Sequence, residues 1–296
     1  MRTGTGRHPA ARAEGGGRAL RFGLAVRPPY RLDRTVSVLQ RLPSNPVDVW
    51  ANGAYLRAFD AGAAAVTWRV VQDGPLLRVE LRGPAGPAPP WRARLRRMLG
   101  LDVNLAAFGA IARRTPALAP LLGLARGLRP PRFASLHEAF ASVILFQQVS
   151  LPSAVAILRR LVLSLSTPVE LDGTALVPFP SAAAIADAPT GLLRRAGLSG
   201  AKARALRAAC DGVAAGRLDE AALHATATPA LVERLREGVG IGPWTAGLVA
   251  LRYFGRLDVF PPGDVAAAKA LGQVGAEDLV ERLGAWRGML YYLLFA

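Results

Sequence analysis

The fold is decided by the stretch Leu231–Leu271, which reads LVERLREGVGIGPWTAGLVALRYFGRLDVFPPGDVAAAKAL. A charged helical run ends at Glu237, the five residues GVGIG follow, and a second helical pattern starts at Pro243. Two short helices joined by a glycine-rich turn predict a helix-hairpin-helix over residues 231–252. Glycines let backbone N–H groups approach an outside anion, and proline suits the first position of a helix. The hairpin is therefore expected to present helix N-terminal amides to a phosphate.

A single carboxylate, Asp264, follows this hairpin at the start of the next helical run. It comes directly after Pro261-Pro262-Gly263 and before AAAKAL. An aspartate at this position is expected to cap the helix, which is worth ~1 kcal/mol. A carboxylate close to a phosphate-binding turn can also have a chemical role, and one side chain can do both.

The charge balance indicates an anionic partner. The 296 residues include 37 Lys and Arg against 21 Asp and Glu, a formal net charge of +16. Nucleic acid is the leading partner and an anionic membrane surface is the rival. A general compositional bias toward Ala, Arg, Gly and Pro is a third explanation, because it would raise the positive charge without any anionic partner.

Cysteine and histidine usage argues against metal and disulfide sites. Cys210 is the only cysteine, so an intramolecular disulfide, a Cys-rich zinc site and a four-cysteine iron–sulfur cluster are excluded. The three histidines, His8, His137 and His224, are far apart and lack ligand spacing. We expect an intracellular protein without a catalytic metal.

An uncharged run of twenty residues, Ala139–Leu158, is long enough to span a bilayer. Its middle carries Gln147, Gln148 and Pro152, where a membrane tolerates polar groups least. We expect two buried helices here, the second capped by Ser150.

The domain organisation follows from composition and pattern. Residues 1–20 are expected to form a disordered basic arm. Residues 21–90 predict a small α+β domain, because Ala64–Val71 and Leu76–Leu81 alternate in hydrophobicity around an Asp73-Gly74 turn. The Pro/Gly-rich segment Gly83–Pro90 predicts a stiff linker. Residues 91–296 predict helices throughout.

Several motifs carry a resemblance to one protein family. They are PPY (Pro28–Tyr30), FQQVS (Phe146–Ser150), GLSGAKARAL (Gly197–Leu206), GVGIGPWTA (Gly238–Ala246), VFPPGD (Val259–Asp264) and AWR (Ala285–Arg287). With these motifs in this order, the chain resembles the helix-hairpin-helix DNA glycosylase superfamily, and within it the DNA-3-methyladenine glycosylase II branch. The resemblance covers about Gly23 to Ala296. It implies an α+β fold class, with a small N-terminal α/β unit containing an antiparallel sheet and an all-helical glycosylase region after it.

The resemblance assigns catalysis to Asp264. In this family the matching aspartate supports displacement of a damaged base from its sugar, because a carboxylate stabilises an oxocarbenium-like transition state or deprotonates water. Bifunctional branches carry a lysine at the position of Trp244, which attacks the sugar. Indole has no nucleophilic amine, so the resemblance implies a monofunctional glycosylase that leaves an abasic site uncut.

The same resemblance assigns the base pocket. Trp244 and Trp286 match aromatic positions that line the pocket and stack on a flipped base. Leu248 replaces an aromatic residue there, which implies a wider pocket. Gln147 or Gln148 is expected to fill the gap that the flipped base leaves in the duplex; an ordinary polar helix terminus is the alternative for both.

The hairpin is expected to hold the DNA backbone. Gly240, Gly242 and Thr245 are the candidates, through backbone amides and a hydroxyl, and a structural monovalent cation on the turn carbonyls is possible in hairpins of this type. Otherwise no cofactor is implied.

The expected partner is double-stranded DNA containing alkylated bases, bound by a monomer without a membrane, in the cytoplasm with the nucleoid. A non-catalytic DNA-binding protein is the main alternative, and an 8-oxoguanine-type lyase is disfavoured by the tryptophan after the hairpin.

Overall fold

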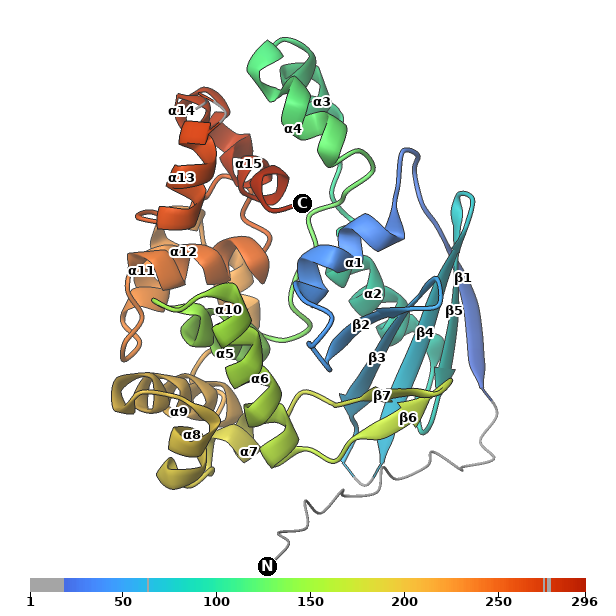
Figure 1. The fold of residues 1–296 in the computed structure, drawn as a ribbon, viewed down its shortest axis with the longest axis vertical. Coiled ribbons are helices and arrows are strands. Elements are labelled where there is room, and N and C mark those ends of the chain that lie inside the picture. Colours follow the sequence, from blue (N-terminus) through green and yellow to red (C-terminus); the bar gives the residue numbers. More distant parts are fainter. Residues whose placement is uncertain (1–18, 63, 274, 276–277) are drawn as a thin grey trace, which may run out of the picture.

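The computed structural model describes residues 19–62, 64–273, 275 and 278–296. It has two parts: an antiparallel sheet with two helices near the N-terminus, and a larger helical region (Figure 1). The fold class expected from the sequence is confirmed. Residues 1–18 of the predicted basic arm lie outside the described residues, and the first strand begins at Leu20.

The sheet has five antiparallel strands in the order β1-β5-β4-β3-β2. Two of its strands, β4 and β5, are those predicted around the Asp73-Gly74 turn, and they pair in register through Val70 and Val79. One buried face is built on Trp68, whose ring meets those of Tyr55 and Phe59 edge-on at 5.6 and 4.5 Å. The strands are β1 (Leu20–Ala25), β2 (Asp48–Ala51), β3 (Ala54–Asp60), β4 (Ala65–Asp73) and β5 (Leu76–Arg82).

Two helices pack with this sheet. Helix α1 (Leu32–Gln40) buries Leu32 and Val36 in the same core as the strands. Helix α2 (Ala88–Met98) starts inside the segment predicted to be a stiff linker and crosses the expected boundary at residue 90. Because Leu95 and Met98 are fully buried in the sheet's core, α2 packs with the N-terminal part.

The remaining chain is helical with one exception. The prediction of helix throughout residues 91–296 is wrong at β6 (Val169–Leu171) and β7 (Thr174–Leu176), a two-stranded hairpin. Its Leu171 and Leu176 are buried against Ala54 and Leu56 of β3, so the hairpin extends the contact between the two parts.

The helices of this region share one large core. They are α3 (Ala106–Arg113), α4 (Ala119–Leu124), α5 (Leu136–Phe146), α6 (Leu151–Leu165), α7 (Ala182–Ala186), α8 (Thr190–Ala196), α9 (Gly200–Ala214), α10 (Glu220–Ala225), α11 (Thr228–Arg236), α12 (Pro243–Arg252), α13 (Val265–Gln273), α14 (Leu279–Arg282) and α15 (Arg287–Leu294), with 3-10 turns η1 (Pro116–Leu118) and η2 (Gly284–Trp286).

The uncharged run at residues 139–158 is divided as expected between α5 and α6. Ser150 caps α6, since its hydroxyl accepts a hydrogen bond from the Ser153 backbone N–H. Within the described residues, no helix combines the length and hydropathy needed to cross a bilayer.

Candidate active site

The predicted helix-hairpin-helix is formed by α11 and α12. Gly240 in the turn has φ +71°, and a Cβ added there would lie 2.7 Å from the Cβ of Ala205 on α9. Both the left-handed backbone and the close approach therefore require glycine. Gly242 is the N-cap of α12, and Pro243 stands in its first turn. Gly240, Gly242 and Pro243 are all exposed, which leaves this helix end open to an external group.

Gln147 ties the end of α5 to this hairpin. Its Nε2 donates to Thr245 Oγ1 at 2.8 Å and lies 3.5 Å from the Gly240 carbonyl oxygen. Its own carbonyl oxygen accepts from Lys202 Nζ at 2.6 Å. Thr245 is 2% exposed, so its hydroxyl faces the protein rather than an outside phosphate. Of the predicted phosphate ligands, the structure leaves Gly240 and Gly242 on the surface.

Gln148 differs from Gln147 in its exposure, its backbone conformation and its contacts. It is exposed, it follows the last turn of α5, and its backbone is left-handed with φ +52°. A non-glycine residue in that region of φ/ψ space is uncommon and marks a position that the surrounding structure imposes. The structure thus separates two residues that the sequence treats alike: Gln147 is a structural clamp and Gln148 is a free side chain.

Asp264 uses both carboxylate oxygens. Oδ1 accepts from the Ala267 backbone N–H at 2.9 Å, so the predicted helix cap on α13 is confirmed. Oδ2 accepts from Trp244 Nε1 at 2.8 Å and from the Tyr291 hydroxyl at 3.0 Å. Hydrogen bonds to an ionised acceptor are about twice as strong as neutral ones. Three donors therefore fix this carboxylate in one orientation, while the side chain stays partly exposed.

Tyr291, on α15, is a site residue that the sequence analysis does not identify. Burial, and next the negative charge of Asp264, raise the pKa of its phenol well above the ordinary value. It therefore stays protonated and keeps donating to the carboxylate.

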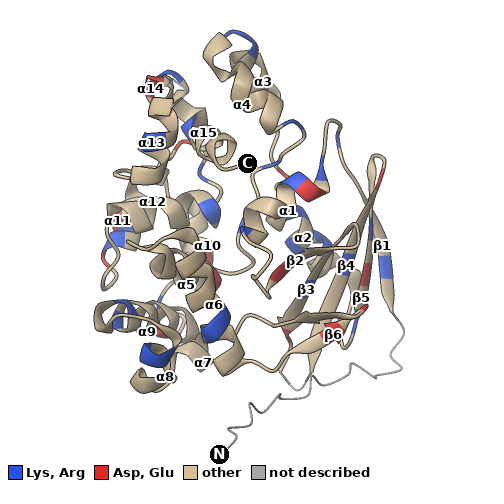
Figure 2. Cartoon of the chain, in the orientation of Figure 1, with Lys and Arg blue, Asp and Glu red and all other residues tan. Residues whose placement is uncertain are grey.

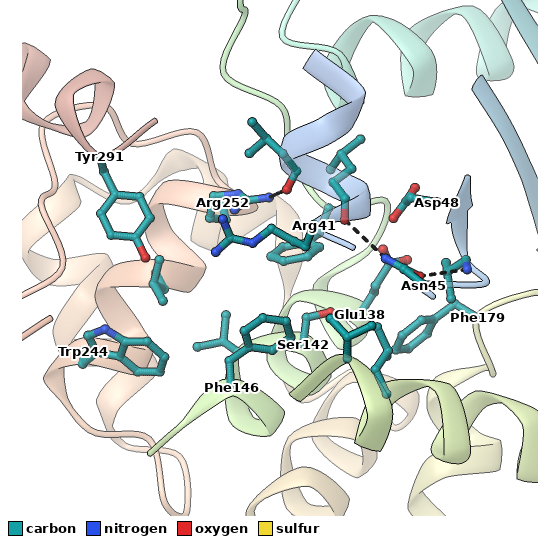
Figure 3. A pocket seen from close by; sticks show the side chains of 18 residues that line it. Arg41, Asn45, Asp48, Glu138, Ser142, Phe146, Phe179, Trp244, Arg252 and Tyr291 are labelled. Carbon is teal, nitrogen blue, oxygen red and sulfur yellow. Dashed lines mark hydrogen bonds between the residues drawn. The ribbon is translucent and has the colours of Figure 1, made fainter. Parts of the chain in front are cut away.

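A pocket of about 70 Å³ is lined by Trp244 and Tyr291, the two side chains that donate to Asp264 Oδ2 (Figure 3). Asp264 itself is not one of the lining residues. Leu248 of α12 and Phe146 of α5 line it as well. The rest of this side comes from the end of α1, the segment after it and the start of β2: Val38, Leu39, Arg41, Asn45, Val47 and Asp48. Trp286 is not among the lining residues. Its ring packs against Phe108 of α3, with centroids 6.0 Å apart. Of the predicted pocket residues, the structure brings Trp244 and Leu248 together and places Trp286 elsewhere.

Arg41 enters the pocket from the end of α1, extending toward Tyr291 (Figure 3). Its backbone has φ +64° and ψ −53°, and the Leu42 N–H donates to the Gln40 carbonyl across it at 2.7 Å. This is a γ-turn of the rare, strained type. Burial, and then the charge of Arg252, lower the pKa of Arg41 to about 10, so it remains a cation near neutral pH. Nothing in the amino-acid sequence marks this residue as part of the pocket.

A buried ion network forms the opposite wall. Arg57 of β3 donates to Asp48 Oδ1 at 2.6 Å and to Glu138 Oε2 on α5, and all three are less than 5% exposed. Tyr55 also donates to Asp48 Oδ1, at 2.6 Å. The two carboxylates that line the pocket therefore share the single positive charge of one guanidinium.

Basic residues lie on several helices of the same region as the hairpin. Figure 2 shows Lys and Arg along α6, α8 and α9, and α9 contacts the hairpin turn through Ala205. A positive surface beside exposed helix N-terminal amides favours a polyanion such as the DNA backbone.

Two family models match the chain: the AlkA N-terminal domain over residues 21–135, and the HhH-GPD superfamily base excision DNA repair protein over residues 141–281. A relative in Mycobacterium tuberculosis, named "probable bifunctional transcriptional activator/DNA repair enzyme AlkA", is 33% identical over 188 residues, which cover 61% of this chain. The match spans 36% of that relative's length.

Solved structures give a similar result. A 3-methyladenine DNA-glycosylase from Archaeoglobus fulgidus has a TM-score of 0.78 at 25% identity, covering 92% of this chain and 97% of its own. An 8-oxoguanine glycosylase/lyase from Clostridium acetobutylicum, in complex with double-stranded DNA, has a TM-score of 0.71 at 16% identity over 90% of each chain. At that identity the second likeness concerns the fold alone.

Proposed function

We propose, from the premise that the chain belongs to the HhH-GPD superfamily of base excision DNA repair proteins, that it is a monofunctional DNA glycosylase. It hydrolyses the N-glycosidic bond of alkylated purines, of the 3-methyladenine type, and leaves an abasic site. The observation that carries this proposal is the Asp264 carboxylate, held by Trp244 and Tyr291, two aromatic side chains that also line a pocket.

The reaction is a hydrolysis at C1′ of the damaged nucleotide. As the bond from C1′ to the base nitrogen breaks, its electron pair leaves with the base and positive charge develops on the sugar. Asp264 stabilises that charge at close range. A water oxygen then bonds to C1′, and its proton passes to the carboxylate or to solvent. The donors on Oδ2 keep the carboxylate oriented while this happens.

The flipped base is proposed to stack on Trp244, with Leu248 leaving room beside it. The exposed amides at Gly240 and Gly242 hold the backbone phosphate, with the predicted monovalent cation as an optional bridge. Gln148, exposed at the end of α5, is the better candidate for filling the vacated space in the duplex, because Gln147 is committed to Thr245.

The absence of lyase chemistry is part of the proposal. A Schiff base at C1′ needs an amine with access to the sugar. Trp244 occupies the position where bifunctional relatives carry lysine, and Lys202 donates to the carbonyl oxygens of Leu145 and Gln147. We further propose that the protein acts as a monomer on chromosomal DNA in the cytoplasm.

The experiment compares wild type with Asp264→Asn on duplexes that contain one 3-methyladenine or one 1,N6-ethenoadenine. Released base is measured directly, and strand cleavage is measured before and after heating in alkali. We expect base release that depends on Asp264, with strand breaks only after alkali. Equal release by wild type and Asp264→Asn would refute the enzymatic role and favour a non-catalytic DNA-binding protein; a borohydride-trapped adduct would establish a lyase instead.

A further inference from the structure

The end of helix α5 is held by two other helices. A helix leaves its last backbone carbonyls without partners inside the helix. Here the Nζ of Lys202, on α9, donates to the carbonyl oxygens of Leu145 and Gln147 at 3.1 and 2.6 Å. The Nε2 of Gln147 donates to Thr245 Oγ1 on α12 at 2.8 Å. Helices α9 and α12 therefore fix Gln147 by its backbone and by its side chain.

The ammonium of Lys202 is engaged at this helix end. The side chain is partly buried, and burial lowers the pKa of its ammonium. Within the described parts of the chain, Nζ donates to these two carbonyl oxygens and no carboxylate pairs with it. A cation is favourable there, because the backbone dipoles give the carboxyl end of a helix a partial negative charge. Lys202 thus gives up part of its hydration to hold two carbonyl groups in place.

Lysine is rare in this sequence. Of the 37 Lys and Arg residues, only Lys202 and Lys269 are lysine. An ammonium is a compact head with rotatable donors, whereas a guanidinium is a planar fork suited to carboxylate and phosphate. Two carbonyl oxygens at one helix end therefore suit the ammonium. Lys202 belongs to the GLSGAKARAL motif, which has no part in the proposed chemistry at Asp264.

The residue directly after this fixed point is the exposed Gln148. Its backbone is left-handed, with φ +52°, a conformation that a non-glycine residue keeps only where its surroundings impose it. On the far side of the loop, Ser150 caps α6 through the Ser153 N–H. Because the peptide group is planar, holding the carbonyl of residue 147 also places the N–H and Cα of Gln148. The bond from Lys202 therefore sets the direction in which the Gln148 side chain leaves the loop.

We propose that Lys202 is a positioning residue that aims Gln148 at the space which the flipped base vacates in the duplex. Lys202 acts through the Gln147 carbonyl and does not itself touch the damaged nucleotide. A plain helix cap is the alternative, and it would stabilise the fold without any link to Gln148. The inference rests on the proposed glycosylase function and on the part that Gln148 has in it.

The first test is a double-mutant cycle on base excision. Wild type, Lys202→Met, Gln148→Ala and the double variant are compared in single turnover, at saturating protein, on a duplex with one 1,N6-ethenoadenine. Lys202→Met keeps a long apolar stem and removes the donors. We expect each single variant to slow excision about tenfold and the double variant to be no slower than the slower single one, since residues in one hydrogen-bonded network are not additive. Lys269→Met, at the exposed lysine of α13, is the control and should excise at the wild-type rate.

A spectroscopic signature separates positioning from stability. The fluorescence of 2-aminopurine beside an abasic-site analogue changes when a side chain enters the gap, and this measurement needs no excision. We expect wild type and Lys269→Met to change the signal, and Lys202→Met and Gln148→Ala to lose most of that change. Thermal unfolding is measured for every variant. Lys202→Arg, which keeps a cation at the end of α5 with its donors farther out, replaces Lys202→Met if the latter does not fold.

Multiplied defects in the double variant, or a normal fluorescence change with Lys202→Met, would show that Lys202 is only a helix cap. Excision at the wild-type rate by Gln148→Ala would remove the plug and the inference with it. If wild type releases no base in an Asp264-dependent way, the proposed function fails, while the fluorescence measurement still decides the inference about Lys202.

Discussion

The buried ion network around Arg57 makes the sharpest prediction about stability. Arg57→Met keeps most of the side-chain volume and removes the guanidinium that donates to both Asp48 and Glu138. Arg57 is 1% exposed and its two partners are at most 5% exposed, so solvent cannot replace it. Removing one member of a buried pair costs about 3–5 kcal/mol. A protein of ordinary stability remains folded after such a loss, which keeps the measurement possible.

The matched control is a surface ion pair between the same sheet and the β6/β7 turn. Arg69 of β4 pairs with Asp172 at 3.2 Å, with the two side chains 39% and 36% exposed. Because water screens such a pair, Arg69→Met should cost at most about 1 kcal/mol. Urea denaturation at pH 7 measures both free energies of unfolding, with the slope against urea checked for constancy.

The pH dependence of the free energy of unfolding gives an independent test of the same argument. Burial raises the pKa of Glu138 above its ordinary value in the folded protein, and Arg57 opposes that rise. Without Arg57 the pKa of Glu138 rises further. An acid with a raised pKa in the folded state binds its proton more tightly there, so folding gains stability as pH falls from the folded pKa toward the unfolded one. The deficit of Arg57→Met should therefore shrink between pH 7 and pH 5, by up to about 1.4 kcal/mol per pH unit.

Adding Glu138→Gln to Arg57→Met should recover more than half of the loss at pH 7, because Asp48 still accepts from Tyr55. The reasoning is refuted if Arg57→Met costs no more than Arg69→Met, or if its deficit grows on acidification.

Two further predictions concern the DNA-facing surface. Gly240→Ala should destabilise the hairpin and weaken binding to a duplex with an abasic-site analogue about tenfold, since its φ is +71° and the new Cβ meets Ala205 at 2.7 Å. The control for fluorescence anisotropy and thermal unfolding is Gly123→Ala in α4, outside the hairpin, where an added Cβ has no atom within 4 Å; equal behaviour of the two variants would contradict the argument. Gln148→Ala should slow base excision without changing the free energy of unfolding, whereas Gln147→Ala should cost about 0.5–1.5 kcal/mol through its bond to Thr245; a destabilised Gln148→Ala would show that the two roles are reversed.

Local sequence was sufficient for the elements with strong local signals. The glycines and Pro243 specify the hairpin, because backbone conformation and helix initiation depend on a few neighbouring residues. Asp264 was predicted as a helix cap for the same reason, and the bond from Ala267 confirms it. The β6/β7 hairpin was missed, since three-residue strands have no measurable alternation and are stabilised by burial against β3.

Contacts between distant segments were beyond the reach of the sequence. Tyr291 meets Asp264 across 27 residues, and Arg41 enters a pocket whose other wall lies about 200 residues later. Which of Gln147 and Gln148 has the structural role depends on which side chain donates to Thr245, and that contact is visible only in the folded chain. Trp286, expected in the pocket, packs on Phe108 instead.

The sequence by itself therefore determined the hairpin, the capped carboxylate after it and the α+β fold class, because these follow from short-range backbone preferences and recurring motifs. Only the tertiary structure decided what surrounds the carboxylate and which charges face the pocket. The physical reason is that hydrogen bonds and desolvated charges act over a few ångströms in space, and packing alone brings residues distant in the chain within that range.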